Sequence, residues 1–119
     1  MTASLFPDLA PPQTPKTDRT RYIRRVQAAV IQLAMRNSEV NADAVHRLVE
    51  APEGISPNVM GVAFTGLVSA GLIEPVRFER STRVQRHGNV FRVWRIANYG
   101  SASAYLEALR KTGDAHELV

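Results

Sequence analysis

The hydrophobic repeat of this chain changes at Gly71, and this change restricts the fold more than any other feature. Before Gly71, apolar residues recur at the three- to four-residue spacing of helices. After it, residues 72–78 and 90–96 alternate as strands do. Glycine readily adopts the left-handed conformation that ends many helices. The sequence therefore predicts an α+β chain in which helices precede a two-stranded hairpin.

Three helices are predicted before this point. The first covers about residues 19–36, begins at a cap formed by Asp18 or Thr17, and has one buried face. That face consists of Tyr22, Val26, Ala29, Val30, Leu33 and Ala34. After a short extended bridge at residues 39–40, Asn41 can cap a second, short helix.

The third helix is predicted to start at Pro57, because proline is favoured at the first helical position and Ser56 before it can act as the cap. We expect Met60, Phe64 and Leu67 to point into the core. Residues 79–89 then form a long hairpin loop.

A last helix is predicted after the hairpin, capped by Ser101 and ended by Gly113. Its apolar residues either complete the core or pair with a second subunit. In the second strand, alternation places Trp94 and Ile96 on the same side as Arg92, and we interpret Trp94 as a core residue rather than a stacking platform.

Length and composition favour one compact domain. The chain has 119 residues, 45% of them hydrophobic, and no cysteine that could form a disulfide or a thiolate metal site. Residues 1–17 hold four prolines and are expected to be a disordered arm; residues 18–97 form the domain and 98–119 the last helix and tail. The first residues do not resemble a secretory signal, so we expect a cytoplasmic protein.

Positive charge gathers in the hairpin. The chain has a net charge of +4, and residues 75–97 hold six arginines with Glu79 as the single acid. These arginines are Arg77, Arg80, Arg83, Arg86, Arg92 and Arg95. Such a segment favours a polyanionic partner, although a solvated, arginine-rich surface is the alternative.

Several of these motifs resemble a known family. Ser56-Pro57 opening the third helix, and Leu67-x-x-x-Gly71-Leu72-Ile73 closing it, are similar to winged helix-turn-helix domains over about residues 18–97. The resemblance implies a three-helix bundle with a two- or three-stranded antiparallel wing sheet, to which this chain adds a C-terminal helix. Arg83-x-x-Arg86-His87-Gly88 and Val93-Trp94-Arg95 also resemble small phage- or prophage-encoded winged-helix proteins of DNA metabolism.

By this resemblance, the chain binds double-stranded DNA as an accessory or regulatory protein, for example in transcription, and can form a homodimer. The helix at residues 57–70 would enter a major groove. Its groove-facing residues would be Ser56, Asn58, Val59, Val62 and Thr65. The wing at residues 79–89 would contact the backbone or a minor groove. Its contacts would come from Arg80, Thr82, Arg83, Gln85, Arg86, His87 and Asn89.

The third helix departs from the usual pattern because residues 54–73 carry no charge. A protein-interaction or dimerisation module, without direct reading of DNA, is therefore the alternative function. Its contact surface would be Val59, Val62, Ala63 and Gly66. The run contains too many polar residues and glycines to span a membrane.

Other site types find little support. The three histidines, His46, His87 and His116, are too far apart to indicate a metal site, and no catalytic motif is present, so we expect no enzyme activity and no cofactor. Residues 3–6, Ala-Ser-Leu-Phe, faintly resemble the short peptides with which bacterial replication proteins bind the sliding clamp, but lack the leading glutamine. The arm thus either has no partner or binds a protein.

Overall fold

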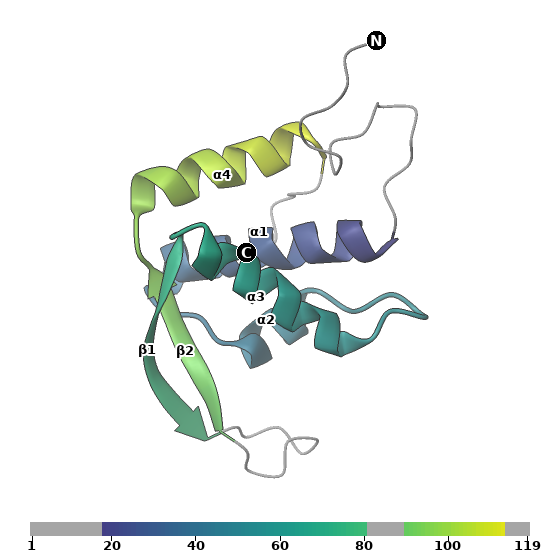
Figure 1. Ribbon diagram of the computed structural model, residues 1–119, viewed down its shortest axis with the longest axis horizontal. Coiled ribbons are helices and arrows are strands. Elements are labelled where there is room, and N and C mark those ends of the chain that lie inside the picture. Colours follow the sequence, from purple (N-terminus) through teal and green to yellow (C-terminus); the bar gives the residue numbers. More distant parts are fainter. Residues whose placement is uncertain (1–17, 81–89, 114–119) are drawn as a thin grey trace.

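The computed structural model describes residues 18–80 and 90–113, and these form an α+β structure. In this part of the chain, four α-helices lie together and one antiparallel pair of strands lies at one side of them (Figure 1). In chain order the elements are α1 (Asp18–Asn37), α2 (Ala42–Leu48), the 3-10 turn η2 (Pro57–Val59), α3 (Met60–Ser69), β1 (Ile73–Arg80), β2 (Val90–Ile96) and α4 (Tyr99–Lys111). The predicted arm, the centre of the predicted loop and residues 114–119 lie outside the described residues.

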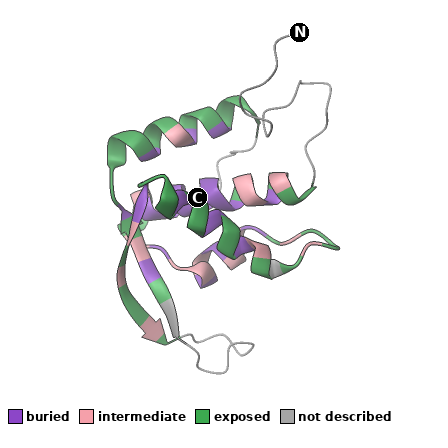
Figure 2. Ribbon diagram, in the orientation of Figure 1, coloured by how far each residue is buried: buried purple, intermediate pink, exposed green. Residues whose placement is uncertain are grey.

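Helix α1 lies at the centre of the fold. It contacts α2, α3, α4 and β2, and every residue from 26 to 34 is buried (Figure 2). The prediction of a single buried face was therefore wrong. Gln27, Ala28, Ile31 and Gln32 are buried as well, because α4 covers a side of α1 that the other elements leave open.

Helix α4 completes the core. Ala102, Leu106 and Leu109 are all buried in the hydrophobic core of the chain. Of the two alternatives, completing the core or pairing with a second subunit, the structure thus shows the first. Its cap is Asn98 rather than the predicted Ser101: the Asn98 Oδ1 accepts a hydrogen bond from the Ser101 backbone N–H at 2.9 Å. Helix α4 consequently begins at Tyr99, and Ser101 is the residue whose amide is capped.

The segment between α1 and α2 is positioned by two predicted features. Asn41 Oδ1 accepts a hydrogen bond from Ala44 N at 2.9 Å, so Asn41 caps α2 as expected. Val40 forms an isolated antiparallel bridge with Trp94, with N···O distances of 2.9 and 2.8 Å in the two directions. This bridge places the α1–α2 turn beside β2, where Glu39 can reach the hairpin.

Candidate functional site

The start of α3 is a tighter turn than the sequence predicts. Ser56 Oγ accepts a hydrogen bond from Asn58 N at 3.2 Å, so Ser56 caps the 3-10 turn η2. The N-cap of α3 itself is Val59, which forms no side-chain cap hydrogen bond, so the predicted role of Ser56 as the cap of the helix was wrong. Residues Pro57–Val59 then form a 3-10 turn, and α-helical geometry begins at Met60 rather than at Pro57. The hydroxyl of Ser56 is thus engaged with its own backbone, while Asn58 is exposed.

The end of α3 is fixed by the predicted glycine. Gly71 has φ 75°, its N–H donates to Val68 O at 2.9 Å, and Leu72 N–H donates to Leu67 O at 3.0 Å. This pair of hydrogen bonds is the Schellman arrangement, which favours glycine at the left-handed position. Leu67 and Leu72 are both buried, so the chain enters β1 with a fixed direction.

Helix α3 divides into a buried face and an uncharged outward face. The buried residues are Met60, Ala63, Phe64 and Leu67, which confirms the three predicted core positions. The exposed ones include Ser56 and Asn58 before the helix, and Val62 and Thr65 within it. Two expectations were wrong. Val59 is half-buried against the core. Ala63 is fully buried, because helical spacing places it on the same face as Met60 and Leu67.

A polar contact holds α3 against α1 and α4. The buried Gln27 of α1 donates from Nε2 to Ala63 O at 3.3 Å and accepts from Tyr105 Oη of α4 at 2.5 Å. A Cβ atom added at Gly66 would lie 2.9 Å from Gln27 Nε2, so glycine permits this close approach of α3. Burial raises the pKa of Tyr105, which keeps its hydroxyl a donor at neutral pH.

The pairing of β1 with β2 contains an irregularity that decides on which face of the hairpin the side chains after Pro75 lie. Pro75 pairs with Trp94, and the register shifts between Pro75 and Arg77, so that Phe78 pairs with Arg92. Regular pairing would instead have set Arg77 directly opposite Arg92, and like charges in that arrangement are destabilising. The extra residue therefore moves Arg77 to the other side of the hairpin.

The hairpin consequently has two chemically different faces. We call one the α3-side face, because Trp94 on it contacts Phe64 of α3, with ring centroids 5.9 Å apart. Its described residues are Ile73, Pro75, Phe78, Arg80, Arg92, Trp94 and Ile96. We call the opposite one the far face. Its residues are Glu74, Arg77, Glu79, Val93 and Arg95.

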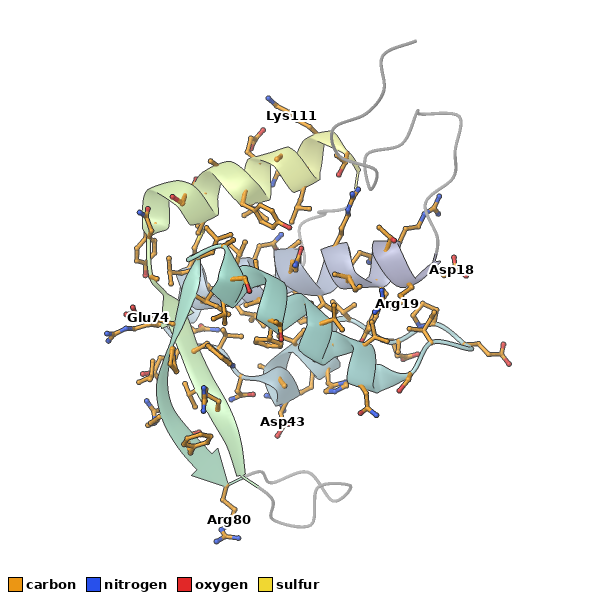
Figure 3. All side chains as sticks on the ribbon, in the orientation of Figure 1. Asp18, Arg19, Asp43, Glu74, Arg80 and Lys111 are labelled. Carbon is orange, nitrogen blue, oxygen red and sulfur yellow. The ribbon has the colours of Figure 1, made fainter. Side chains whose placement is uncertain are left out.

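On the far face, the arginines are paired with carboxylates of the same chain. Arg77 binds both carboxylate oxygens of Glu39 at 2.8 Å and also Glu79 at 2.6 Å. Arg95 Nε lies 2.6 Å from Glu74 Oε2. Figure 3 shows Glu74 projecting from the side of the hairpin that faces away from the helices. These two guanidinium groups are thus neutralised locally.

The pKa directions agree with this pairing. The hydrogen bond from Arg77 lowers the pKa of Glu39, with a further contribution from the charges of Arg77 and Arg95. Hydrogen bonds to Glu39 and Glu79 raise the pKa of Arg77 above its ordinary value. Glu39 and Arg77 are therefore both charged, and stay paired, at neutral pH.

On the α3-side face, arginine meets aromatic rings. The Arg92 guanidinium carbon lies 4.5 Å from the centroid of the Phe78 ring and 5.5 Å from that of Trp94. Such contacts are cation–π interactions. Trp94 is half-buried and packs on the core through Phe64, as predicted, whereas Phe78 is 60% exposed. The stack thus runs from the core outward along the hairpin.

Of the predicted wing residues, the structure describes only Arg80. Arg80 was expected in the loop, but with Glu79 it belongs to β1; it is exposed at the end of the strand (Figure 3). The other predicted wing contacts lie outside the described residues, namely Thr82, Arg83, Gln85, Arg86, His87 and Asn89.

Sequence reasoning missed the pairing of charges across the hairpin. Glu39 lies 38 residues before Arg77, so nothing local indicates that contact. The pair of Glu74 and Arg95 could have been found by aligning the two strands through Ile73 and Ile96, which are cross-strand partners. The Phe78–Arg92 contact requires knowledge of the register shift.

Two further findings concern other kinds of site. No group of three or more His, Asp or Glu side chains within residues 18–80 and 90–113 is arranged to hold a metal ion. In the same part of the chain, none of the helices is long and apolar enough to cross a membrane.

Comparisons with known proteins found no matching protein-family model, curated protein or solved structure. The functional conclusion therefore depends on the geometry of α3 and the hairpin.

Proposed function

We propose that the chain is a winged helix-turn-helix protein that binds double-stranded DNA through α3 and the α3-side face of the hairpin. The observation that carries the proposal is the separation of charge on the hairpin. Carboxylates neutralise Arg77 and Arg95 on the far face, whereas Arg92 on the α3-side face contacts aromatic rings rather than a carboxylate among the described residues.

The dimensions of α3 suit a major groove. A helix with its side chains is about 10–12 Å across and the groove is about 12 Å wide. The outward face of α3 carries no charge that the DNA backbone would repel or attract, and its exposed side chains are uncharged, with Val62 and Val68 as the large apolar ones. Asn58 could pair with the edge of an adenine, and Val62 could contact a thymine methyl group.

Phosphate binding would then come from the hairpin. Arg92 lies on the side of the hairpin that α3 occupies. Arg83 and Arg86 are assigned to this role from the sequence alone. Since each neutralised phosphate adds about 0.9 to the slope of log affinity against log salt, binding should be strongly sensitive to salt.

The proposal is tested by fluorescence anisotropy with a labelled duplex over a series of salt concentrations. We expect the logarithm of the affinity to fall linearly with the logarithm of the salt concentration. The combined change of Arg83 and Arg86 to alanine should weaken binding to all sequences and lower the slope. Asn58→Ala should instead relax sequence preference in a selection from random duplexes. Absence of binding at low salt, or affinity independent of salt, would contradict the proposal.

A second candidate is a protein-interaction or dimerisation module. The observation that favours it is the exposed apolar surface of α3, where Val62 and Val68 are 44% and 39% exposed. Sedimentation velocity with and without duplex separates the two functions. A dimer broken by Val62→Asp, with no change in sedimentation on addition of duplex, would favour the second candidate.

A further inference from the structure

Phe78 has the largest exposed fraction of the large hydrophobic side chains that the structure describes as exposed. Its side chain is 60% exposed, compared with 56% for Tyr99, 44% for Val62 and 39% for Val68. It lies within the paired part of β1, just beyond the register shift and opposite Arg92. The exposure remains although the Arg92 guanidinium is only 4.5 Å from the ring centroid.

The surroundings of Phe78 combine a flat apolar surface with a positive charge. Arg92 lies over the Phe78 ring and near the Trp94 ring, and Trp94 is fixed in turn by Phe64 of α3. An exposed ring with a guanidinium beside it matches a nucleotide, whose base offers a π-face and whose phosphate is anionic. A purely apolar partner would leave the Arg92 charge buried without a counterion.

The chemistry restricts which bases can use this surface. Paired bases inside a duplex present their edges in the grooves, and their faces are covered by the neighbouring base pairs. A face becomes available for stacking on an aromatic side chain when the base is unpaired or displaced from the stack. Phe78 therefore fits an unpaired base better than an intact groove.

We propose that Phe78 and Arg92 form a stacking site for an unpaired nucleobase adjoining the duplex that α3 binds. The substrate class is thus double-stranded DNA that contains an unpaired or displaced base. This inference rests on the proposed function, because α3 and the hairpin must hold the duplex for the base to reach Phe78. Arg92 supports the ring and places its charge near the phosphate of the stacked nucleotide.

The test compares two labelled duplexes of equal length, one fully paired and one with a single extrahelical 2-aminopurine. Anisotropy gives the affinities, and 2-aminopurine emission reports stacking directly. We expect about tenfold tighter binding of the second duplex and quenched emission in the complex, since stacking of one base on an aromatic side chain has an effect of this order. Phe78→Leu should abolish both the preference and the quenching.

Two control variants separate stacking from folding and from general loss of an exposed ring. Phe78→Trp keeps a flat ring and should keep the preference. Tyr99→Leu removes a similarly exposed ring from α4 and should change neither the preference nor the quenching. Equal affinity for both duplexes, or a preference retained by Phe78→Leu, overturns the stacking site while leaving the proposed function standing. Failure to bind either duplex at low salt overturns the proposed function itself.

Discussion

The two faces of the hairpin use the same residue type in opposite ways. On the far face, two arginines are paired with three glutamates, one of which comes from the α1–α2 turn. On the α3-side face, Arg92 is stacked on Phe78 and Trp94. The number of arginines in a segment therefore does not measure the positive charge it offers, because the strand register decides which of them meet carboxylates.

The irregularity in β1 creates this difference. It turns Arg77 toward Glu39 and Glu79, and brings Phe78 opposite Arg92. Exposed ion pairs contribute little to stability, so the main consequence of the pairing is electrostatic. The far face is left close to neutral, and a polyanion would be attracted to the side of the hairpin where α3 lies.

The first prediction concerns the contact of Trp94 with Phe64, which fixes the α3-side face of the hairpin to the core. Trp94 packs against Phe64 and the core, so Trp94→Ala should lower the free energy of unfolding by about 2–4 kcal/mol, near the lower end of the range for large aromatic truncations because the residue is half-buried. Urea denaturation followed by circular dichroism measures this loss. Trp94→Phe should cost less, and a negligible loss for Trp94→Ala would show that the hairpin is not fixed through this contact.

Arg92→Ala and Arg95→Ala form a matched pair on opposite faces of β2. We expect Arg92→Ala to weaken duplex binding roughly tenfold at about 0.1 M salt and to lower the salt slope by about 0.9, the effect of losing one phosphate contact. Arg95→Ala should leave both nearly unchanged, because Glu74 already neutralises that charge. Equal losses in the two variants would remove the distinction between the faces.

Removing acids from the far face should leave its arginines without carboxylate partners, and so give it a positive charge like that of the α3-side face. Glu39→Gln combined with Glu74→Gln removes the carboxylate that pairs with Arg95 and one of the two that pair with Arg77. Duplex affinity that does not depend on sequence should therefore rise severalfold, and the salt slope should steepen. Anisotropy with random-sequence duplex measures both. As the control, Glu107→Gln on α4 changes a glutamate whose partner is Arg110, away from the hairpin, and should have a smaller effect.

The smallest expected effect is the pH dependence of the Glu39–Arg77 pair. The pKa of Glu39 is lower in the folded chain than its ordinary value of 4.5, so the stabilisation is present above that value and is lost as pH falls through the lowered pKa. The difference in unfolding free energy between the wild-type chain and Glu39→Gln should thus be constant from about pH 7 to 5 and decrease below it. Urea melts at a series of pH values check this, and a difference that grows on acidification would contradict the pairing.

Local signals in the sequence were sufficient for much of the fold. Asn41 caps α2 and Gly71 ends α3 because both act through hydrogen bonds within a few residues. The start of α4 was misplaced because Asn98 and Ser101 are both good caps, three residues apart, and the choice depends on where β2 ends. The burial of α1 on all sides depends on α4, which lies more than sixty residues away in the chain.

The candidate site was less predictable than the fold. The exposure of Asn58, Val62 and Thr65 agrees with what the winged-helix resemblance implied, whereas the half-burial of Val59 does not. Asn58 and Val59 both lie in the 3-10 turn, which the sequence did not predict. The separation of the hairpin arginines depends on a register shift and on Glu39, which belongs to a different element. Neither has a signature in the strand sequences alone.

The central claim is that DNA meets α3 and the α3-side face of the hairpin, and backbone amide chemical shifts during titration with duplex test it most directly. We expect the largest changes at Asn58, along the outward side of α3 and at Arg92, with little change at Glu74 and Arg77. Changes confined to the far face, or no changes at low salt, would contradict the claim.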